Sequence, residues 1–120
     1  MNYEVKTHPI PIEKFETIKK YDMVLMNNVL EHCYDIHKIF DVINSILKEN
    51  GILVFSDVYF KSESLKIILT EVYDAGHPLK LSEFFMENFL NGFKSIYNKD
   101  YHNLYNQSWR NDKYFIGVKK

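Results

Sequence analysis

Two short apolar runs, separated by a segment of helical periodicity, constrain the fold of this chain more than any other feature. The first run, residues 21–26, ends at Asn27 and Asn28, and the second covers residues 51–56. Between them, apolar residues recur every three or four positions, as on one face of a helix. These residues are Ile36, Ile39, Phe40, Ile43, Ile46 and Leu47. Because strand, helix and strand in this order form a parallel pair covered by the helix, the sequence predicts an α/β fold with a parallel sheet.

Capping and turn residues predict where these elements begin and end. Asp35 is a candidate N-cap for the helix, and Tyr34 and Ile39 are spaced as a hydrophobic staple. Asn50-Gly51 is a typical helix stop. The apolar run that follows is bounded by turn residues, so we expect a strand buried on both faces.

The second half of the chain predicts further elements of both kinds. A second helix is expected from a Ser62 or Ser64 cap to Gly76, with Val72 and Tyr73 on its apolar face. A third helix is expected after a Ser82 cap, with a staple between Leu81 and Met86 and an end at Gly92. Further strands are predicted at residues 3–6, 93–101 and 114–118, with a polar connection at residues 102–112.

Length and charge bound the class of protein. A chain of 120 residues fits one domain, and its net charge of −1 gives no basic surplus for binding nucleic acid or anionic lipid. One cysteine cannot form an internal disulfide and fits a reducing cytosol, so we expect a cytoplasmic protein. No apolar run approaches the ~18 residues that a membrane helix needs.

Residues 21–32, Tyr-Asp-Met-Val-Leu-Met-Asn-Asn-Val-Leu-Glu-His, carry a more specific pattern. This stretch resembles the fourth strand and following turn of S-adenosylmethionine-dependent methyltransferases of the Rossmann-like class. The resemblance continues through the amphipathic segment to residues 47–55, although Glu49 and Asn50 stand where relatives usually have Pro and Gly. It implies a partial Rossmann-like methyltransferase sheet, strands 4 to 7 of the family order, with flanking helices.

The glycine turn that grips the cofactor in this family has no counterpart here. No Gly-x-Gly occurs in the sequence, and only about twenty residues precede the fourth-strand match. Three strands and two crossovers do not fit in that length, because one βαβ unit needs ~30 residues. We therefore expect residues 1–120 to form a single methyltransferase-like domain that is incomplete on its N-terminal side. An excerpt, a truncated gene product and a repurposed half-domain all fit this expectation.

The resemblance implies a cofactor-binding role for Asn27, Asn28 and Val29, beside the methionine part of S-adenosyl-L-methionine. The position agrees with a general rule, since open α/β sheets bind ligands at the carboxyl ends of their strands. The alternative is an ordinary turn in which the Asn side chains bond their own backbone.

Glu31 and His32 are the candidate catalytic residues, with His32 as a general base. In some relatives, notably the ubiquinone-pathway O-methyltransferases, this Glu-His helps to hold a divalent cation, but their additional Glu corresponds to Asn28 here. In many others the pair packs and caps the turn without a metal. We therefore predict no metal. His8-Pro9 and His77-Pro78 are likewise not expected to bind one, because no further ligands stand at defined spacing.

Two other residues have a structural and a functional interpretation. Cys33 is expected to serve in packing, since no partner for a reactive thiol is identifiable by spacing. Trp109, in a polar segment, either stacks on a substrate or covers a sheet edge.

The resemblance implies an S-adenosylmethionine-dependent methyltransferase, or a fragment of one, that transfers a methyl group to a small-molecule or other acceptor. The isolated chain is expected to be inactive. The alternatives are a non-catalytic half-domain that binds a partner or regulates one, and an unrelated small α/β binding protein. Because the first three family strands are missing, residues 22–26 should form an exposed edge. That edge predicts a homodimer or a complementing N-terminal half as partner.

Overall fold

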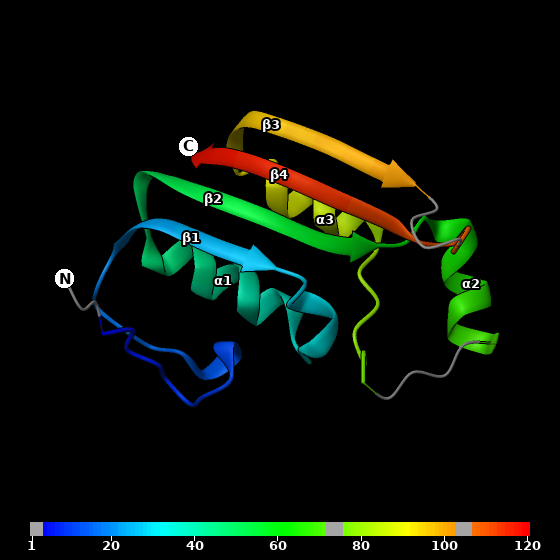
Figure 1. Ribbon diagram of the computed structural model, residues 1–120, viewed down its shortest axis with the longest axis horizontal. Helices are drawn as coiled ribbons and strands as arrows, with labels where there is room; N and C mark the ends of the chain where they lie inside the picture. The colour runs from blue at the N-terminus through cyan, green and yellow to red at the C-terminus, as the bar shows by residue number, and fades with distance from the viewer. Residues whose placement is uncertain (1–3, 72–75, 103–106) are drawn as a thin grey trace.

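The computed structural model describes residues 4–71, 76–102 and 107–120. Their strands form a four-stranded sheet with the order β1-β2-β4-β3 (Figure 1). The strands are β1 (Tyr21–Asn27), β2 (Leu47–Tyr59), β3 (Phe93–His102) and β4 (Asn111–Lys119). β1 and β2 are parallel, as predicted, but β4 is antiparallel to both of its neighbours. The parallel prediction is wrong there because residues 103–110 are too few for the crossover of a dozen or more residues that parallel neighbours need.

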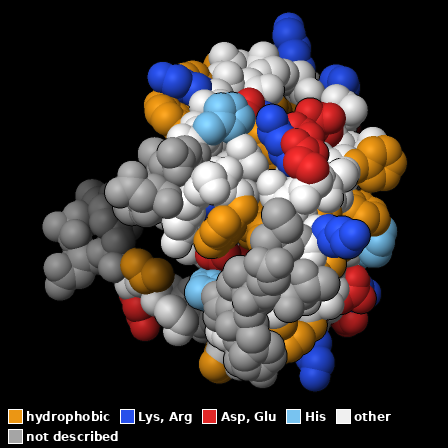
Figure 2. All heavy atoms as spheres, turned by 90° about the vertical axis from the view of Figure 1, so that its right-hand side faces the viewer, with side chains coloured by type: hydrophobic (Ala, Val, Ile, Leu, Met, Phe, Trp, Pro, Cys, Tyr) orange, Lys and Arg blue, Asp and Glu red, His pale blue; other side chains and the backbone are white. Residues whose placement is uncertain are grey.

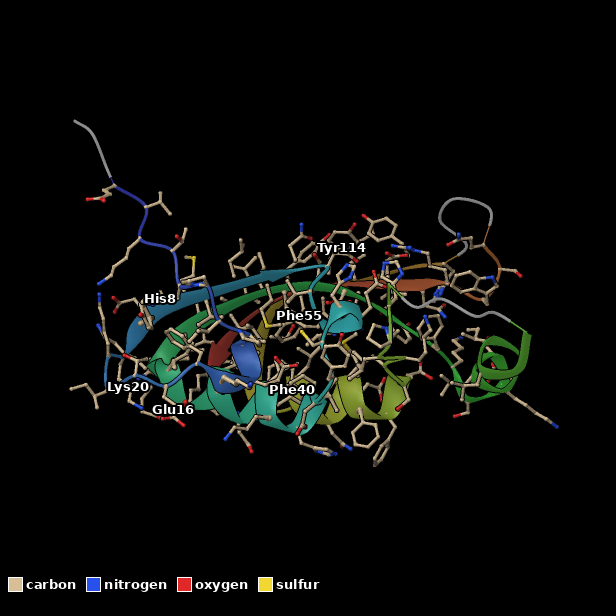
Figure 3. The ribbon with its side chains drawn as sticks, turned by 90° about the horizontal axis from the view of Figure 1, so that it is seen from below. His8, Glu16, Lys20, Phe40, Phe55 and Tyr114 are labelled. Carbon is tan, nitrogen blue, oxygen red and sulfur yellow. The ribbon has the colours of Figure 1, made fainter. Side chains whose placement is uncertain are left out.

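The helices pack against one face of this sheet. Figure 3 shows α1 (Ile36–Ile46) and α3 (Glu83–Leu90) below the strands, and in Figures 1 and 3 α2 (Ser62–Glu71) lies beyond the end of β2. Phe55 points from β2 toward the helices and is buried. The rings of Phe40 and Phe89 stack at 3.9 Å between α1 and α3. A short 3-10 helix, η1 (Ile12–Lys14), packs beside α1. The main hydrophobic core therefore lies on one face of the sheet, between the strands and the helices α1 and α3.

The start of α1 is confirmed at the predicted cap. The Lys38 N–H donates to Asp35 Oδ1 at 3.0 Å, so the Asp35 side chain satisfies one of the free donors of the first turn. The predicted staple is wrong, because Tyr34 is 84% exposed while Ile39 is fully buried. Tyr34 points into solvent instead, and its backbone N–H donates to Glu13 Oε1 at 2.9 Å.

The end of α1 differs from the prediction. The helix ends at Ile46, and β2 begins at the next residue, so Asn50-Gly51 lies inside the strand. β2 bulges at this point, since Tyr21 pairs with Leu47 but Met23 pairs with Ile52. Asn50 has a φ of 61°, a conformation in which Asn is enriched among non-glycine residues. The two residues therefore form a kink in β2 rather than a helix stop.

Most of the remaining elements lie close to their predicted positions. Ser82 caps α3, with Leu81 and Met86 both buried, and the predicted strand at residues 93–101 is β3. α2 begins at Ser62, while Val72 and Tyr73 lie outside the described residues. The C-terminal strand starts three residues earlier than predicted, at Asn111, which shortens the predicted connection. No strand forms at residues 4–6, and Tyr3 lies outside the described part of the chain.

The second face of the sheet lacks a helical cover among the described residues. Leu53 and Phe55 are buried under the helices, but the alternate residues Ile52 and Val54 are only half-buried, so burial on both faces is wrong. On this open face Leu25 is 69% exposed. A groove of about 270 Å³ runs over β1, β2 and β4, with mostly apolar side chains along it. As predicted, β1 is an edge strand, and it borders this uncovered face.

Candidate functional site

The turn after β1 is fastened to the end of β2. The backbone N–H of Asn28 donates to the carbonyl of Ser56 at 2.8 Å, and the Ser56 hydroxyl donates to Asn27 Oδ1. Asn28 has a φ of 53°, in the left-handed region, and both Asn side chains are exposed. The chain then enters a 3-10 turn, η2 (Leu30–His32). The sequence placed Asn27, Asn28 and Val29 at the carboxyl end of a parallel strand, and the structure places them there.

A buried carboxylate in β2, that of Asp57, accepts hydrogen bonds from the backbone of the same turn. Asp57 Oδ2 accepts hydrogen bonds from the backbone N–H groups of Val29 at 2.9 Å and Leu30 at 2.8 Å. Its Oδ1 accepts from the N–H of Val58 at 2.9 Å. Burial raises the pKa of Asp57, and the three hydrogen bonds oppose that rise. Sequence reasoning missed this residue, although an Asp directly after a buried apolar run was a usable signal.

The turn also forms one wall of a polar cavity of about 240 Å³. Asn27, Asn28, Ser56 and Asp57 line one side, and Arg110, Asp112, Lys113 and Tyr114 line the other. Arg110 Nη2 lies 2.7 Å from Asp112 Oδ1, and Lys113 Nζ lies 2.8 Å from Asp100 Oδ1. Each cation of the cavity is therefore held against a carboxylate. Paired charges of both signs suit a ligand that carries both an ammonium and a carboxylate group.

Figure 2 shows the end of the molecule at which β1 and β2 finish. Acidic and basic side chains lie side by side on it, without a large patch of one sign in this view. This mixed surface agrees with the net charge of −1. Within the described part of the chain, none of the helices has the length and apolar character needed to cross a membrane.

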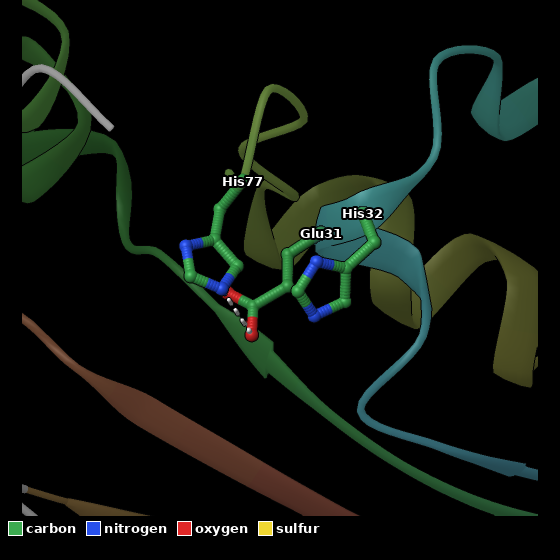
Figure 4. A group of neighbouring side chains, drawn as sticks. All are labelled: Glu31, His32 and His77. Carbon is green, nitrogen blue, oxygen red and sulfur yellow. Dashed lines mark ion pairs between the residues drawn. The ribbon is translucent and has the colours of Figure 1, made fainter. Parts of the chain in front are cut away.

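A third side chain, that of His77, lies beside Glu31 and His32, although no signal in the sequence connected it with them. His77 comes from the segment between α2 and α3 and lies against η2 (Figure 4). Its Nε2 is 3.8 Å from Glu31 Oε1, and its ring centroid is 4.6 Å from that of His32. His32 Nδ1 lies 3.0 Å from the carbonyl oxygen of Gly76. His8, by contrast, contacts the ring of Phe15.

Cys33 and Trp109 both pack against neighbouring residues. Cys33 is buried, its Sγ donates to the carbonyl of Val29 at 3.3 Å, and burial raises the pKa of the thiol. A raised pKa lowers the thiolate fraction, which agrees with the expected packing role. The Trp109 ring stacks on Phe60 at 5.8 Å, beside a small cluster that includes Val58 and Ile68. These contacts favour the structural interpretation of Trp109.

Comparison with known proteins gives one family and a consistent fold. Residues 4–111 match the family described as methyltransferase domain. Malonyl-[acyl-carrier protein] O-methyltransferase 2 of Ilyobacter polytropus is 39% identical over 62 residues, which are 48% of this chain and 24% of that protein.

Solved structures of similar shape are longer than this chain. The N-methyltransferase NodS of Bradyrhizobium japonicum, in complex with S-adenosyl-L-homocysteine, superposes with a TM-score of 0.64 at 14% identity. That match covers 93% of this chain and 53% of NodS. TehB of Haemophilus influenzae gives a TM-score of 0.70 at 10% identity, covering 98% of this chain and 42% of TehB. The chain thus spans about half the length of these structures, and less of the curated relative.

Proposed function

The chain belongs to the methyltransferase-domain family, and from that premise we propose that it supplies the C-terminal half of an S-adenosylmethionine-dependent methyltransferase site. The partial Rossmann-like sheet expected from the sequence is confirmed by the strand order and by the structural neighbours. The observation that carries the proposal is the fastened turn at the carboxyl end of β1. Open α/β sheets place their ligands at such ends.

The turn and its cavity fit one end of the cofactor. The exposed amides of Asn27 and Asn28, with the backbone of Val29, would hold the methionine part, whose ammonium and carboxylate match the paired charges opposite. When bound, the cofactor supplies an activated methyl group. The sequence offers no Gly-x-Gly to hold the rest of the ligand, so the chain alone should bind the cofactor weakly.

Glu31 and His32 would act on the acceptor side. His32 is exposed at the end of η2 and would serve as the general base, while the less exposed Glu31 lies near His77. The relatives include an O-methyltransferase and an N-methyltransferase by name. The proposal therefore keeps the small-molecule or other acceptor expected from the sequence and leaves the reacting atom open.

A partner half would complete the site. β1 presents an unpaired edge, and the groove beside Leu25 and Val54 is apolar on the uncovered face of the sheet. A glycine-rich half that pairs with β1 and packs on this face would cover both, whether it is part of the same polypeptide or a separate chain. The comparisons do not favour the alternative of a non-catalytic partner-binding or regulatory module.

Titration of the ¹⁵N-labelled chain with S-adenosylhomocysteine tests the cofactor proposal. We expect amide shifts at Asn27, Asn28 and Val29, with a Kd weaker than ~100 μM. Asn28→Gly keeps the left-handed backbone, removes the side-chain amide and should weaken the shifts further. As a matched control, Asn44→Gly changes an Asn in α1, away from the turn. Absence of shifts at these amides with ~5 mM ligand, or shifts confined to other residues, would overturn the proposal.

A further inference from the structure

We propose that Tyr114 contacts the sulfonium centre of the methyl donor and makes the site prefer the donor to its demethylated product. This inference rests on the proposed function, and it concerns β4 rather than the motif at residues 21–32. Tyr114 lines the polar cavity at the end of β1, and it is the one aromatic side chain among the described residues of that lining. A sulfonium is a cation, and the face of an aromatic ring attracts cations.

The strand register places Tyr114 in one row with the turn after β1. Asn27 pairs with Ser56, and Ser56 pairs with Tyr114, so the row crosses three strands that lie ~4.8 Å apart. Figure 3 shows Tyr114 on the face of the sheet away from the helices. The middle residue of the row is a serine, whose small side chain leaves room between the Asn27 amide and the Tyr114 ring. A methionine part held at Asn27 and Asn28 can therefore bring its sulfur against this ring.

Two side chains of β3 support the Tyr114 ring from the other side. The rings of Tyr101 and Tyr114 are nearly perpendicular, with centroids 5.3 Å apart, so Tyr101 fixes the orientation of its neighbour. Lys99 pairs with Tyr114 in the strand register, but its Nζ lies 4.8 Å from the centroid of the Tyr101 ring. Tyr101 thus holds the cation that is closest to Tyr114 in the register. Tyr114 itself is 42% exposed, and a ligand can reach it.

A contact at sulfur distinguishes the methyl donor from the product. Methyl transfer leaves the bonding electron pair on sulfur, which becomes a neutral thioether, while the ammonium and carboxylate of the methionine part stay the same. The pair of Arg110 and Asp112 therefore cannot tell the two molecules apart. Tyr114 can, because its ring attracts only the charged form, and this attraction increases where water is excluded. Tyr114 would thus hold the donor and release the product.

Paired titrations with S-adenosylmethionine and S-adenosylhomocysteine test this role, because the two compounds differ only in the methyl group and the charge at sulfur. Amide shifts of residues 27–29 in the ¹⁵N-labelled full chain give both Kd values. Tyr114→Leu should reduce the preference for S-adenosylmethionine, measured as the ratio of the two Kd values, by about two- to fivefold, the effect of a cation–π contact at an exposed site. Tyr114→Phe keeps the ring and should keep the ratio.

Tyr97→Leu is the matched control, since Tyr97 is 44% exposed and lines the apolar groove on the same face of the sheet. Its ratio should equal that of the wild type.

Three outcomes would overturn the proposal. An unchanged ratio in Tyr114→Leu, or an equal fall in Tyr97→Leu, would overturn the role of Tyr114 and leave the cofactor proposal standing. Absence of amide shifts with both compounds would overturn the two proposals together. Far-UV circular dichroism of each variant comes first. If Tyr114→Leu does not fold, Tyr114→Val, with a residue suited to strands, replaces it under the same criteria.

Discussion

Replacing Asp57 with alanine tests whether one buried carboxylate holds the candidate site together. The substitution removes the acceptors of three backbone N–H groups, those of Val29, Leu30 and Val58. An unsatisfied buried donor costs about 1–3 kcal/mol. Because Asp57 borders the polar cavity, water can reach part of the space left behind, so the lower end applies to each donor. The sum is about 3 kcal/mol of unfolding free energy, a large share of the ~5–15 kcal/mol of a typical domain.

Urea unfolding followed by circular dichroism at pH 7 measures this loss. Asp57→Asn keeps one side-chain oxygen that can accept some of these hydrogen bonds, so it should lose less unfolding free energy than Asp57→Ala. Asp22→Ala is the matched control, because Asp22 is an exposed carboxylate paired with Lys48, and its unfolding midpoint should hardly change. If the unfolding free energy of Asp57→Ala lies within about 1 kcal/mol of the wild-type value, the hydrogen bonds do not hold the turn as argued.

The pH dependence of the same variants gives a second measurement. Burial raises the pKa of Asp57 in the folded chain above its ordinary value of 3.8. The folded state therefore binds a proton where the unfolded chain has lost it, and this contribution to stability decreases as pH rises from 3.8 through the folded pKa. The stability of wild type relative to Asp57→Asn should decrease over that window and then level off. A difference that grows with pH would contradict the reasoning.

Two further predictions concern the bulge and the edge strand. Gly51→Ala places a Cβ 2.8 Å from the Lys48 carbonyl oxygen and from Leu47 Cδ1. It should therefore lower the unfolding free energy, measured in urea, by about 1–3 kcal/mol. Gly92→Ala, whose Cβ would lie 3.3 Å from the Phe89 carbonyl oxygen, should lower it less. Equal losses would mean that the bulge is not tightly packed. Leu25→Lys puts a charge on the exposed side of β1 and should reduce self-association, as measured by sedimentation velocity, relative to Leu69→Lys on α2. A wild-type chain that is monomeric at ~100 μM would refute the prediction that the β1 edge mediates self-association.

The sequence predicted elements well where the signal was local. The helical periodicity of α1 and its Asp35 cap depend on residues within a few positions of one another, and both are confirmed. Asn50-Gly51 was misinterpreted because the same residues favour a helix stop and a left-handed bulge. Only the pairing of Tyr21 with Leu47 distinguishes the two, and that contact joins separate strands.

The residues of the candidate site likewise divide into those with a local signal in the sequence and those brought together only by tertiary contacts. Asn27 to His32 could be located because they follow an apolar strand and match a family motif. His77 could not be joined to them, since it lies 45 residues beyond His32 and meets η2 only through the path of α2 and the segment after it. Asp57 was missed for a related reason: its donors, Val29 and Leu30, belong to the neighbouring strand's turn.

These contacts bear on how a half-site could function. The turn is held by Ser56 and Asp57, which both lie on β2 within this chain. Its conformation, including the φ of 53° at Asn28, therefore does not require the proposed partner half. A partner that docks on β1 would meet ligand-binding groups already in place, and it would lose less conformational entropy in building the complete site. On this reasoning, the proposed partner half should change cofactor affinity more than it changes the backbone of residues 27–32.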